Sequence, residues 1–208
     1  MNFSTTALLL IGYQNDYFSP DGILHGVIEE SLHANDVLSN TINLLDQLKG
    51  ESLLIISTPI CFTANYEELE NPVGILKAVK EAGAFKVGTE GAETIGELKQ
   101  FGDSIVEVPG KRGLDAFSNT ELNEILQNHG VEDVVIAGVV TSVCVDTTGR
   151  SAHEQGYRVA VLSDCTAGRT SYEQHFYCEN IFPIYSEVID SWELLARLSG
   201  KSAERSNG

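Results

Sequence analysis

The sequence has few positive charges, and this shortage argues against partners that are themselves negatively charged. Thirteen of its 208 residues are lysine or arginine and 30 are aspartate or glutamate, which gives a formal net charge of -17 at pH 7. A surface of that sign repels nucleic acids and anionic lipids over a Debye length of about 8 Å. The composition therefore predicts no nucleic-acid partner and no membrane partner.

Long apolar runs and linker-like segments are also missing. The run 7–11 is apolar, but a membrane-spanning helix needs about 20 such residues, and no basic segment with an apolar core behind it marks the N-terminus. We therefore expect a cytoplasmic protein. Because no Pro-, Ser- or Gly-rich linker divides the chain, we expect one domain over residues 1–200, with the small polar residues 201–208 as a flexible tail.

Cysteine is scarce, and metal-binding spacings are absent. The cysteines form no C-x-x-C pair, which argues against a zinc knuckle or a disulfide framework. They are Cys61, Cys144, Cys165 and Cys178. The histidines form no H-x-x-x-H pair, and none has a cysteine at a ligand-like spacing. Glycine-rich nucleotide motifs are missing as well, so we expect no metal ion and no cofactor.

Strand-like and helix-like segments alternate along the chain. Apolar runs bounded by turn residues predict strands at 6–13, 53–58, 104–108, 133–139, 158–163 and 187–189. Amphipathic periodicity predicts helices at 28–48, 94–100, 119–129, 143–155, 172–182 and 191–198. This alternation is typical of an α/β domain with a mostly parallel sheet. With a strand order of 2-1-3-4-5, the carboxyl ends of the first, third and fourth strands would form one site.

Cys144 is the leading candidate for a catalytic nucleophile. An apolar strand ends at Gly138, and the cysteine then falls in the first turn of the predicted helix 143–155, where unpaired N–H groups and the helix dipole favour a thiolate. A cysteine at such a junction is more often a packed small hydrophobe, so the local pattern leaves both roles open. Backbone N–H groups near Thr141 are candidates to bind an oxyanion. Lys111, after the third strand, is a candidate cation beside the thiolate.

Candidate bases follow the first predicted strand. Asp16 and His25 are ionisable groups near its carboxyl end, and a solvated loop position is the alternative role for His25. His153 is excluded as a partner of Cys144, because nine residues of helix separate the two side chains by about 13 Å.

The irregular segment 59–91 is long for a simple connection. Insertions of this kind commonly form a wall or lid over a pocket. Phe62 and Tyr66 from this segment, together with Phe18, are candidate apolar walls of such a pocket. The alternative is that these aromatic side chains belong to the core.

Three segments make the sequence resemble the isochorismatase-like cysteine hydrolases from residue 7 to about residue 198. The first, LLLIGYQNDYFSPDG at 8–22, is similar to the family's opening strand with its Asp-x-Gln-x-Asp-aromatic signature. The second, GKRGLDAFSNTEL at 110–122, resembles the segment that carries the catalytic lysine. The third, IAGVVTSVCVDTTGRSAHEQGYRVAVLSDC at 136–165, resembles the nucleophile segment. Their order and spacing make the resemblance specific.

The resemblance implies a Rossmann-like three-layer αβα fold with a mostly parallel sheet of five or six strands, assembled as a homodimer or homotetramer. It also implies a Cys-Asp-Lys triad that acts on amides or, in some members, on vinyl ethers. By position, Cys144 matches the nucleophile and Lys111 matches the lysine. The N–H groups of Val140 and Cys144 match the oxyanion donors, and a cis peptide bond is implied between Val139 and Val140.

One position departs from the family pattern. Gly12 stands where the family has its catalytic aspartate, and glycine cannot accept the thiol proton. Asp16 matches a different family position that is usually regarded as structural. Three explanations remain open: the residue was changed to trap a ligand, another base such as Asp16 or His25 replaces it, or the protein binds a small molecule without turning it over.

A second departure concerns the nicotinamidase branch of the family. The metal-binding Asp/His motif that follows the second strand in that branch is missing here, because the matching stretch reads STPICFTANYEEL. The sequence therefore favours a metal-free member of the family and argues against nicotinamidase activity.

The leading hypothesis is a cysteine hydrolase that acts on a small amide- or ester-like C–N or C–O substrate. Cys144 would attack the carbonyl carbon, Lys111 would hold the thiolate or the substrate, and the N–H groups of Val140 and Cys144 would stabilise the oxyanion. One alternative is a non-catalytic small-molecule-binding or oligomeric scaffold protein, which Gly12 would explain. The other alternative is an isochorismate-type vinyl ether hydrolase.

Overall fold

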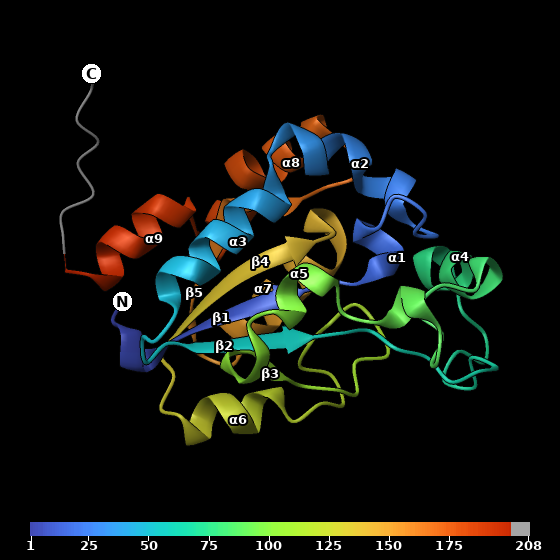
Figure 1. Cartoon of the computed structure of the whole chain (residues 1–208), viewed down its shortest axis with the longest axis horizontal. Coiled ribbons are helices and arrows are strands. Elements are labelled where there is room, and N and C mark those ends of the chain that lie inside the picture. Colours follow the sequence, from blue (N-terminus) through green and yellow to red (C-terminus); the bar gives the residue numbers. More distant parts are fainter. Residues whose placement is uncertain (201–208) are drawn as a thin grey trace.

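A parallel sheet lies at the centre of the structure, a computed structural model that describes residues 1–200 (Figure 1). All neighbouring strands pair in parallel, in the order β3-β2-β1-β4-β5-β6. The strands are β1 Thr6–Ile11, β2 Leu54–Thr58, β3 Val106–Glu107, β4 Asp133–Val139, β5 Arg158–Ala167 and β6 Glu187–Ile189. Helices on both faces complete three layers, which confirms the predicted α/β fold class. The predicted tail 201–208 lies outside the described residues.

The helices connect the strands in chain order. They are α1 Asn15–Phe18, α2 His25–Ala34, α3 Val37–Leu48, α4 Gly74–Ala82, α5 Gly96–Lys99, α6 Leu122–Asn128, α7 Asp146–Glu154, α8 Ser171–Phe176 and α9 Ser191–Leu198. Helix α8 begins at a side-chain cap, because the Thr170 hydroxyl accepts the N–H of Glu173 at 3.1 Å. Within residues 1–200, none of the helices is long and apolar enough to cross a membrane.

The predicted helix 28–48 is wrong as a single element. It divides into α2 and α3 at Asp36, whose φ of 47° is in the left-handed region. The apolar periodicity continues across the break because both helices pack in the same core, where Leu32 and Leu44 are buried in one cluster. Periodicity alone therefore could not distinguish one helix from two.

Strand β1 is buried on both faces, because alternate side chains enter two separate cores. Leu8 and Leu10 belong to the cluster that includes Leu44 of α3, whereas Leu9 belongs to the cluster that includes Leu126 of α6. Figure 1 shows α3 and α9 on one side of the sheet and α6 on the other. A continuous apolar run is the pattern that such a doubly covered strand requires.

The predicted contact of the third strand with the first and fourth strands is wrong. β1 pairs with β2 on one side and with β4 on the other, so its two edges are already occupied. β3 lies beyond β2 at the edge of the sheet and pairs only through Val106 and Glu107. The loop after β3, and not strand adjacency, must therefore carry Lys111 to the other candidate residues.

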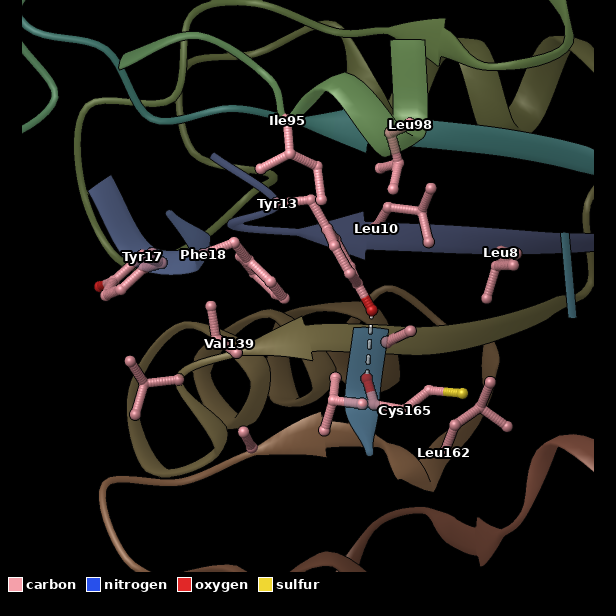
Figure 2. Packing of buried hydrophobic residues seen from close by; sticks show 14 of the residues in the cluster. Leu8, Leu10, Tyr13, Tyr17, Phe18, Ile95, Leu98, Val139, Leu162 and Cys165 are labelled. Carbon is pink, nitrogen blue, oxygen red and sulfur yellow. Dashed lines mark hydrogen bonds between the residues drawn. The ribbon is translucent and has the colours of Figure 1, made fainter. Parts of the chain in front are cut away.

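Tyr13 anchors the chain just after β1 ends. Its hydroxyl lies 2.7 Å from Thr41 Oγ1. It also donates to the carbonyl of Cys165 at 3.3 Å (Figure 2). Phe18 stacks on the Tyr13 ring with a centroid distance of 4.8 Å. Burial raises the pKa of Tyr13 well above its usual value, so the hydroxyl stays protonated as a donor. These contacts hold the backbone on the carboxyl side of Gly12.

Candidate active site

Lys111 and Cys144 lie side by side in the interior at the carboxyl edge of the sheet. The Lys111 Nζ donates to the Cys144 sulfur at 3.4 Å. Lys111 is 1% exposed and Cys144 is 6% exposed. Among the ion pairs formed by residues 1–200, none includes Lys111. A buried amine needs a polar or charged partner, and the sulfur is the one that the structure supplies.

The loop after β3 brings Lys111 to the end of β2. Ile60 and Lys111 form an isolated parallel bridge, and the N–H of Cys61 donates to the Lys111 carbonyl at 3.3 Å. Gly110, directly before the lysine, has a φ of 104°, a conformation that favours glycine. The sequence Pro-Gly-Lys thus makes the turn that places the side chain beside Cys144.

Cys144 lies in a π-helical turn, Thr141–Val145, between β4 and α7. Inside this turn the carbonyl of Val140 accepts two backbone hydrogen bonds, at 3.0 and 3.2 Å. The peptide bond between Val139 and Val140 is cis, at the position that the resemblance implies. The predicted continuous helix is therefore divided: Cys144 belongs to the wider turn, and α7 begins only at Asp146.

Gly138 lets the end of β4 lie against β1. Its φ is 123°, and a Cβ atom there would lie 1.9 Å from the carbonyl oxygen of Ile11. No side chain fits at that distance without moving one of the two strands. The position of Cys144, six residues later, depends on this close contact.

Gly12 lies in a space that neighbouring atoms already occupy. Its φ is 73°, and a Cβ atom there would lie 2.8 Å from the Val139 carbonyl oxygen and 3.5 Å from Cδ2 of Tyr17. Both neighbours are buried. The position where the family has its aspartate is therefore filled from the β4 side, and an aspartate here would require local movement.

A small apolar cavity lies against Lys111 and Cys144. Its volume is about 10 Å³, roughly the space of one water molecule. Helix α4 and its flanking segments supply much of the wall, which agrees with the role predicted for segment 59–91. The lining residues are Gly12, Tyr17, Ile60, Ile75, Leu76, Val79, Phe85, Lys111, Leu114, Val139, Val143 and Cys144.

Tyr17 is a site residue that the sequence reasoning missed. It lines the cavity, and its pKa is raised by burial, by Cys144 and by Asp16, so the phenol remains protonated. Together with the amine and the thiol, it is one of the ionisable groups that line the cavity. The sequence carried no clear periodicity at Tyr17, because α1 is a single short turn. It therefore could not show which of Tyr17 and Phe18 faces Cys144.

Asp16 and His25, the two alternative bases, do not line the cavity. The Asp16 carboxylate accepts the N–H of Phe85 at 2.6 Å, and a Cβ atom on Gly91 would lie 2.2 Å from its Oδ1. This packing makes Asp16 a support for segment 59–91. The His25 Nδ1 lies 2.8 Å from the Tyr17 carbonyl oxygen.

The remaining candidate residues do not line the cavity. Phe62 and Tyr66 contact each other with a centroid distance of 5.5 Å and are buried, as Phe18 is. The Thr141 hydroxyl donates to the side-chain oxygen of Gln174. These four residues support the walls and the nucleophile turn.

A larger hollow of about 630 Å³ lies on the other side of the Ile60–Lys111 bridge. Three of its charged lining residues are in ion pairs: Lys99 pairs with Glu93 at 2.6 Å, and Arg112 pairs with Glu68, which does not line the hollow, at 3.0 Å. Neither Lys111 nor Cys144 lines it. The candidate catalytic residues Lys111 and Cys144 therefore lie at the smaller cavity and not at this hollow.

The other cysteines are poor candidates for a nucleophile. Burial raises the pKa of Cys178 to about 11, and it raises the pKa of Cys165 well above the usual value of a thiol. Burial also raises the pKa of Cys61, partly offset by Arg112. Cys144 differs from all three because a buried amine lies directly against its sulfur.

Comparison with known proteins places these features in a family. The isochorismatase domain matches residues 6–193. The chain is 29% identical over 166 residues to nicotinamidase 3 of Arabidopsis thaliana, covering 80% of this chain and 75% of that protein. It is 30% identical over 166 residues to an uncharacterized isochorismatase family protein of Bacillus subtilis, covering 80% and 79%. The solved structure of a cysteine hydrolase from Pseudomonas syringae superposes with a TM-score of 0.84 and 21% identity, covering 96% of this chain and 95% of that one.

Proposed function

The chain belongs to the isochorismatase family of hydrolases, and from the geometry of its site we propose that it cleaves a small amide- or ester-like substrate through a covalent cysteine intermediate. The observation that carries this proposal is the buried Lys111 Nζ, 3.4 Å from the Cys144 sulfur. An ammonium group at that distance stabilises a thiolate by Coulomb attraction, and the thiolate is the nucleophilic form of cysteine. The similarity to a nicotinamidase supports an amide substrate class.

In the first half-reaction the Cys144 thiolate forms a C–S bond to the substrate carbonyl carbon. The carbonyl electron pair moves to oxygen, where the N–H groups of Val140 and Cys144 stabilise the negative charge. When this intermediate collapses, the C–N or C–O bond breaks. The Lys111 ammonium then gives a proton to the leaving nitrogen or oxygen, which leaves a neutral amine beside a thioester.

In the second half-reaction water attacks the thioester carbon. The Lys111 amine accepts a proton from that water, the C–S bond breaks, and a carboxylic acid and the Cys144 thiolate are released. Lys111 thereby does the proton transfers that an aspartate does in the family mechanism, because Gly12 cannot. The protonated phenol of Tyr17 lines the same cavity and is available to donate a hydrogen bond to the substrate.

The cavity is too small for a substrate in this conformation, so binding requires movement of its outer wall. Helix α4 forms that wall, and residues of positive φ lie at both of its ends, Gly74 at 55° and Gly83 at 79°. Ile75 and Leu76 of this helix are only partly buried. Outward rotation of α4 would open the cavity without disturbing the sheet.

Alkylation with iodoacetamide, followed by mass spectrometry of each cysteine peptide, tests the nucleophile. We expect Cys144 to react faster at neutral pH than Cys178, whose thiol has a pKa of about 11. Lys111→Met should remove this preference because it removes the cation. The matched control is Arg112→Met, which removes the adjacent cation outside the cavity and should keep the preference. Labelling of Cys144 no faster than that of Cys178 would contradict the proposal.

Turnover of a panel of small amides and esters tests the reaction itself. We expect the protein to accumulate an acyl adduct on Cys144, visible as an added mass, and Cys144→Ser to lose at least about 100-fold in rate. Full activity of Cys144→Ala on this panel would contradict the covalent mechanism. Cleavage of a vinyl ether substrate that survives Cys144→Ala would instead favour vinyl ether hydrolysis, in which no acyl-enzyme forms.

The second candidate function is a small-molecule binder without catalysis, and the filled space beside Gly12 favours it. Gly12→Asp, with Gly12→Ala as the steric control, separates the two functions. A hydrolase should be active as it is and should lose activity in both variants, because each introduces a Cβ atom 2.8 Å from the Val139 carbonyl oxygen. A binder should leave every amide and ester of the panel intact as the unchanged protein. If Gly12→Asp then hydrolyses members of the panel and Gly12→Ala does not, the unchanged protein is a binder on a disabled hydrolase scaffold.

A further inference from the structure

His25, Glu29 and His33 project from one face of α2, and we propose that together they bind a zinc ion. The three residues follow one another at intervals of four, and residues at that spacing share a face of a helix. One possible ligand atom from each side chain lies within 4.8 Å of the other two. The sequence search for paired histidines missed this set because a glutamate stands between the two histidines.

His25 is the anchored member of the three. Its Nδ1 lies 2.8 Å from the carbonyl oxygen of Tyr17, an acceptor, so this nitrogen carries the proton in the neutral ring. The lone pair is then on Nε2, which lies 4.0 Å from Glu29 Oε1. A carbonyl group on the opposite ring nitrogen is the usual support of a metal-binding histidine. The side chain is 12% exposed, so its orientation is held by its surroundings.

The other two side chains are free to move toward His25. Glu29 is 58% exposed, and His33 is exposed with its ring centroid 6.4 Å from that of His25 at an interplanar angle of 79°. Zinc bonds of about 2.0–2.2 Å in tetrahedral geometry require ligand atoms roughly 3.3 Å apart. A shift of about 1 Å by each exposed side chain therefore closes the site, with water in the fourth position.

This site is distinct from the cavity beside Cys144, because none of the three residues lines that cavity. The two are connected through Tyr17, whose carbonyl group holds His25 and whose phenol lines the cavity. Zinc would therefore fix the corner between α1 and α2, which lie next to each other in Figure 1. The proposal stands on this geometry alone and does not depend on the proposed hydrolase function.

Calorimetric titration of zinc into the full-length, metal-stripped protein tests the site. We expect one zinc ion per chain, and we expect His33→Gln and Glu29→Gln each to weaken binding by about tenfold or more. The matched control is His175→Gln, because His175 and Glu179 form an exposed pair at 2.9 Å with the same spacing, and no third ligand joins them among residues 1–200. This control should bind zinc as the unchanged protein does.

The absorption spectrum of bound cobalt and the thermal unfolding midpoint give two further tests of the zinc site. Cobalt in place of zinc should show no thiolate charge-transfer absorption, which separates this site from binding to a cysteine. Zinc should also raise the thermal unfolding midpoint of the unchanged protein and not that of His33→Gln. The proposal is overturned if no zinc binds at micromolar concentration, if His33→Gln and Glu29→Gln bind as tightly as the His175→Gln control, or if cobalt binds through thiolate.

Discussion

At Lys111 the protein buries an amine whose hydrogen-bond acceptor is the sulfur of Cys144. Removing an ammonium group from water costs several kcal/mol, and a thiolate partner offsets only part of that. Such a pair is weak evidence for stability, so a role in chemistry is the better explanation of why it is buried.

Replacing Lys111 by Met should separate stability from reactivity. We expect the free energy of unfolding to change little, because the apolar chain keeps the packing and removes the desolvation penalty of the ammonium group, which offsets the lost contact with Cys144. Urea unfolding measures this. Lys111→Ala removes the same charge but leaves a void, so it should be less stable than the Met variant. A Met variant that unfolds at lower urea than the Ala variant would refute this account.

The thiol of Cys178 should make stability depend on pH at the alkaline end. Burial raises its pKa from 9.0 to about 11, so the folded protein favours the neutral thiol. This contribution is fully present below pH 9.0, where the unfolded thiol is also neutral, and it is lost as the pH rises through about 11. The difference in unfolding free energy between the unchanged protein and Cys178→Ala should therefore shrink between these two values. A difference that does not change with pH would contradict the burial argument.

Among the elements, helix α4 supplies three residues to the wall of the cavity, Ile75, Leu76 and Val79. Two tethers hold it: the Lys80 Nζ donates to the Leu69 carbonyl at 2.5 Å, and the Tyr66 hydroxyl donates to the Ala84 carbonyl at 2.9 Å. Both tethers join segments within 59–91, so they close this insertion on itself. A helix attached in this way can open as a unit while the sheet stays intact.

Removing the Tyr66 hydroxyl should loosen α4 without affecting the rest of the fold. In Tyr66→Phe the buried Ala84 carbonyl loses its side-chain donor, so we expect the opening free energy of residues 74–84 to fall by about 1–3 kcal/mol. Amide hydrogen exchange measures this directly. Tyr157→Phe is the matched control, because that hydroxyl donates to Asn123 at 2.7 Å on another part of the molecule. Equal exchange of α4 in both variants would rule out the tether.

Over the whole molecule, a group of apolar side chains remains on the surface of the single chain. Tyr172 is 79% exposed and Phe176 is 41% exposed, and both belong to α8. Tyr172 and Phe176 stack with a centroid distance of 6.3 Å. We propose that this face joins copies of the chain in a homodimer or homotetramer, as the family resemblance implies.

Light scattering should give a mass of two or four times the 22.6 kDa of one chain. Tyr172→Asp should shift the assembly toward the monomer, because a charge would then be buried at the interface. Val73→Asp is the control, since Val73 is 81% exposed at the start of α4 and outside this face. A monomeric mass for the unchanged protein, or equal masses for the two variants, would refute the assembly.

Local patterns in the sequence predicted most strands, because burial on both faces leaves a continuous apolar run that ends at turn residues. Strand β4 and the position of Cys144 after Gly138 were found in this way. Strands at the edge of the sheet were harder to predict. β3 has only two residues and both are exposed, so it leaves no apolar run in the sequence. The strand order depends on which edges pair, and no local pattern records that.

Short-range periodicity was enough to predict the fold class, and the positions of Cys144 and Lys111 after predicted strands, with the resemblance of their motifs to the family, were enough to make them candidates. The folded chain was needed to show that Tyr17 lines the cavity, that Asp16 and His25 do not, and that Val139 occupies the space beside Gly12. Those facts depend on contacts between segments far apart in the chain. Their physical origin is close packing, in which the place of one side chain is set by the neighbours that fill the space around it.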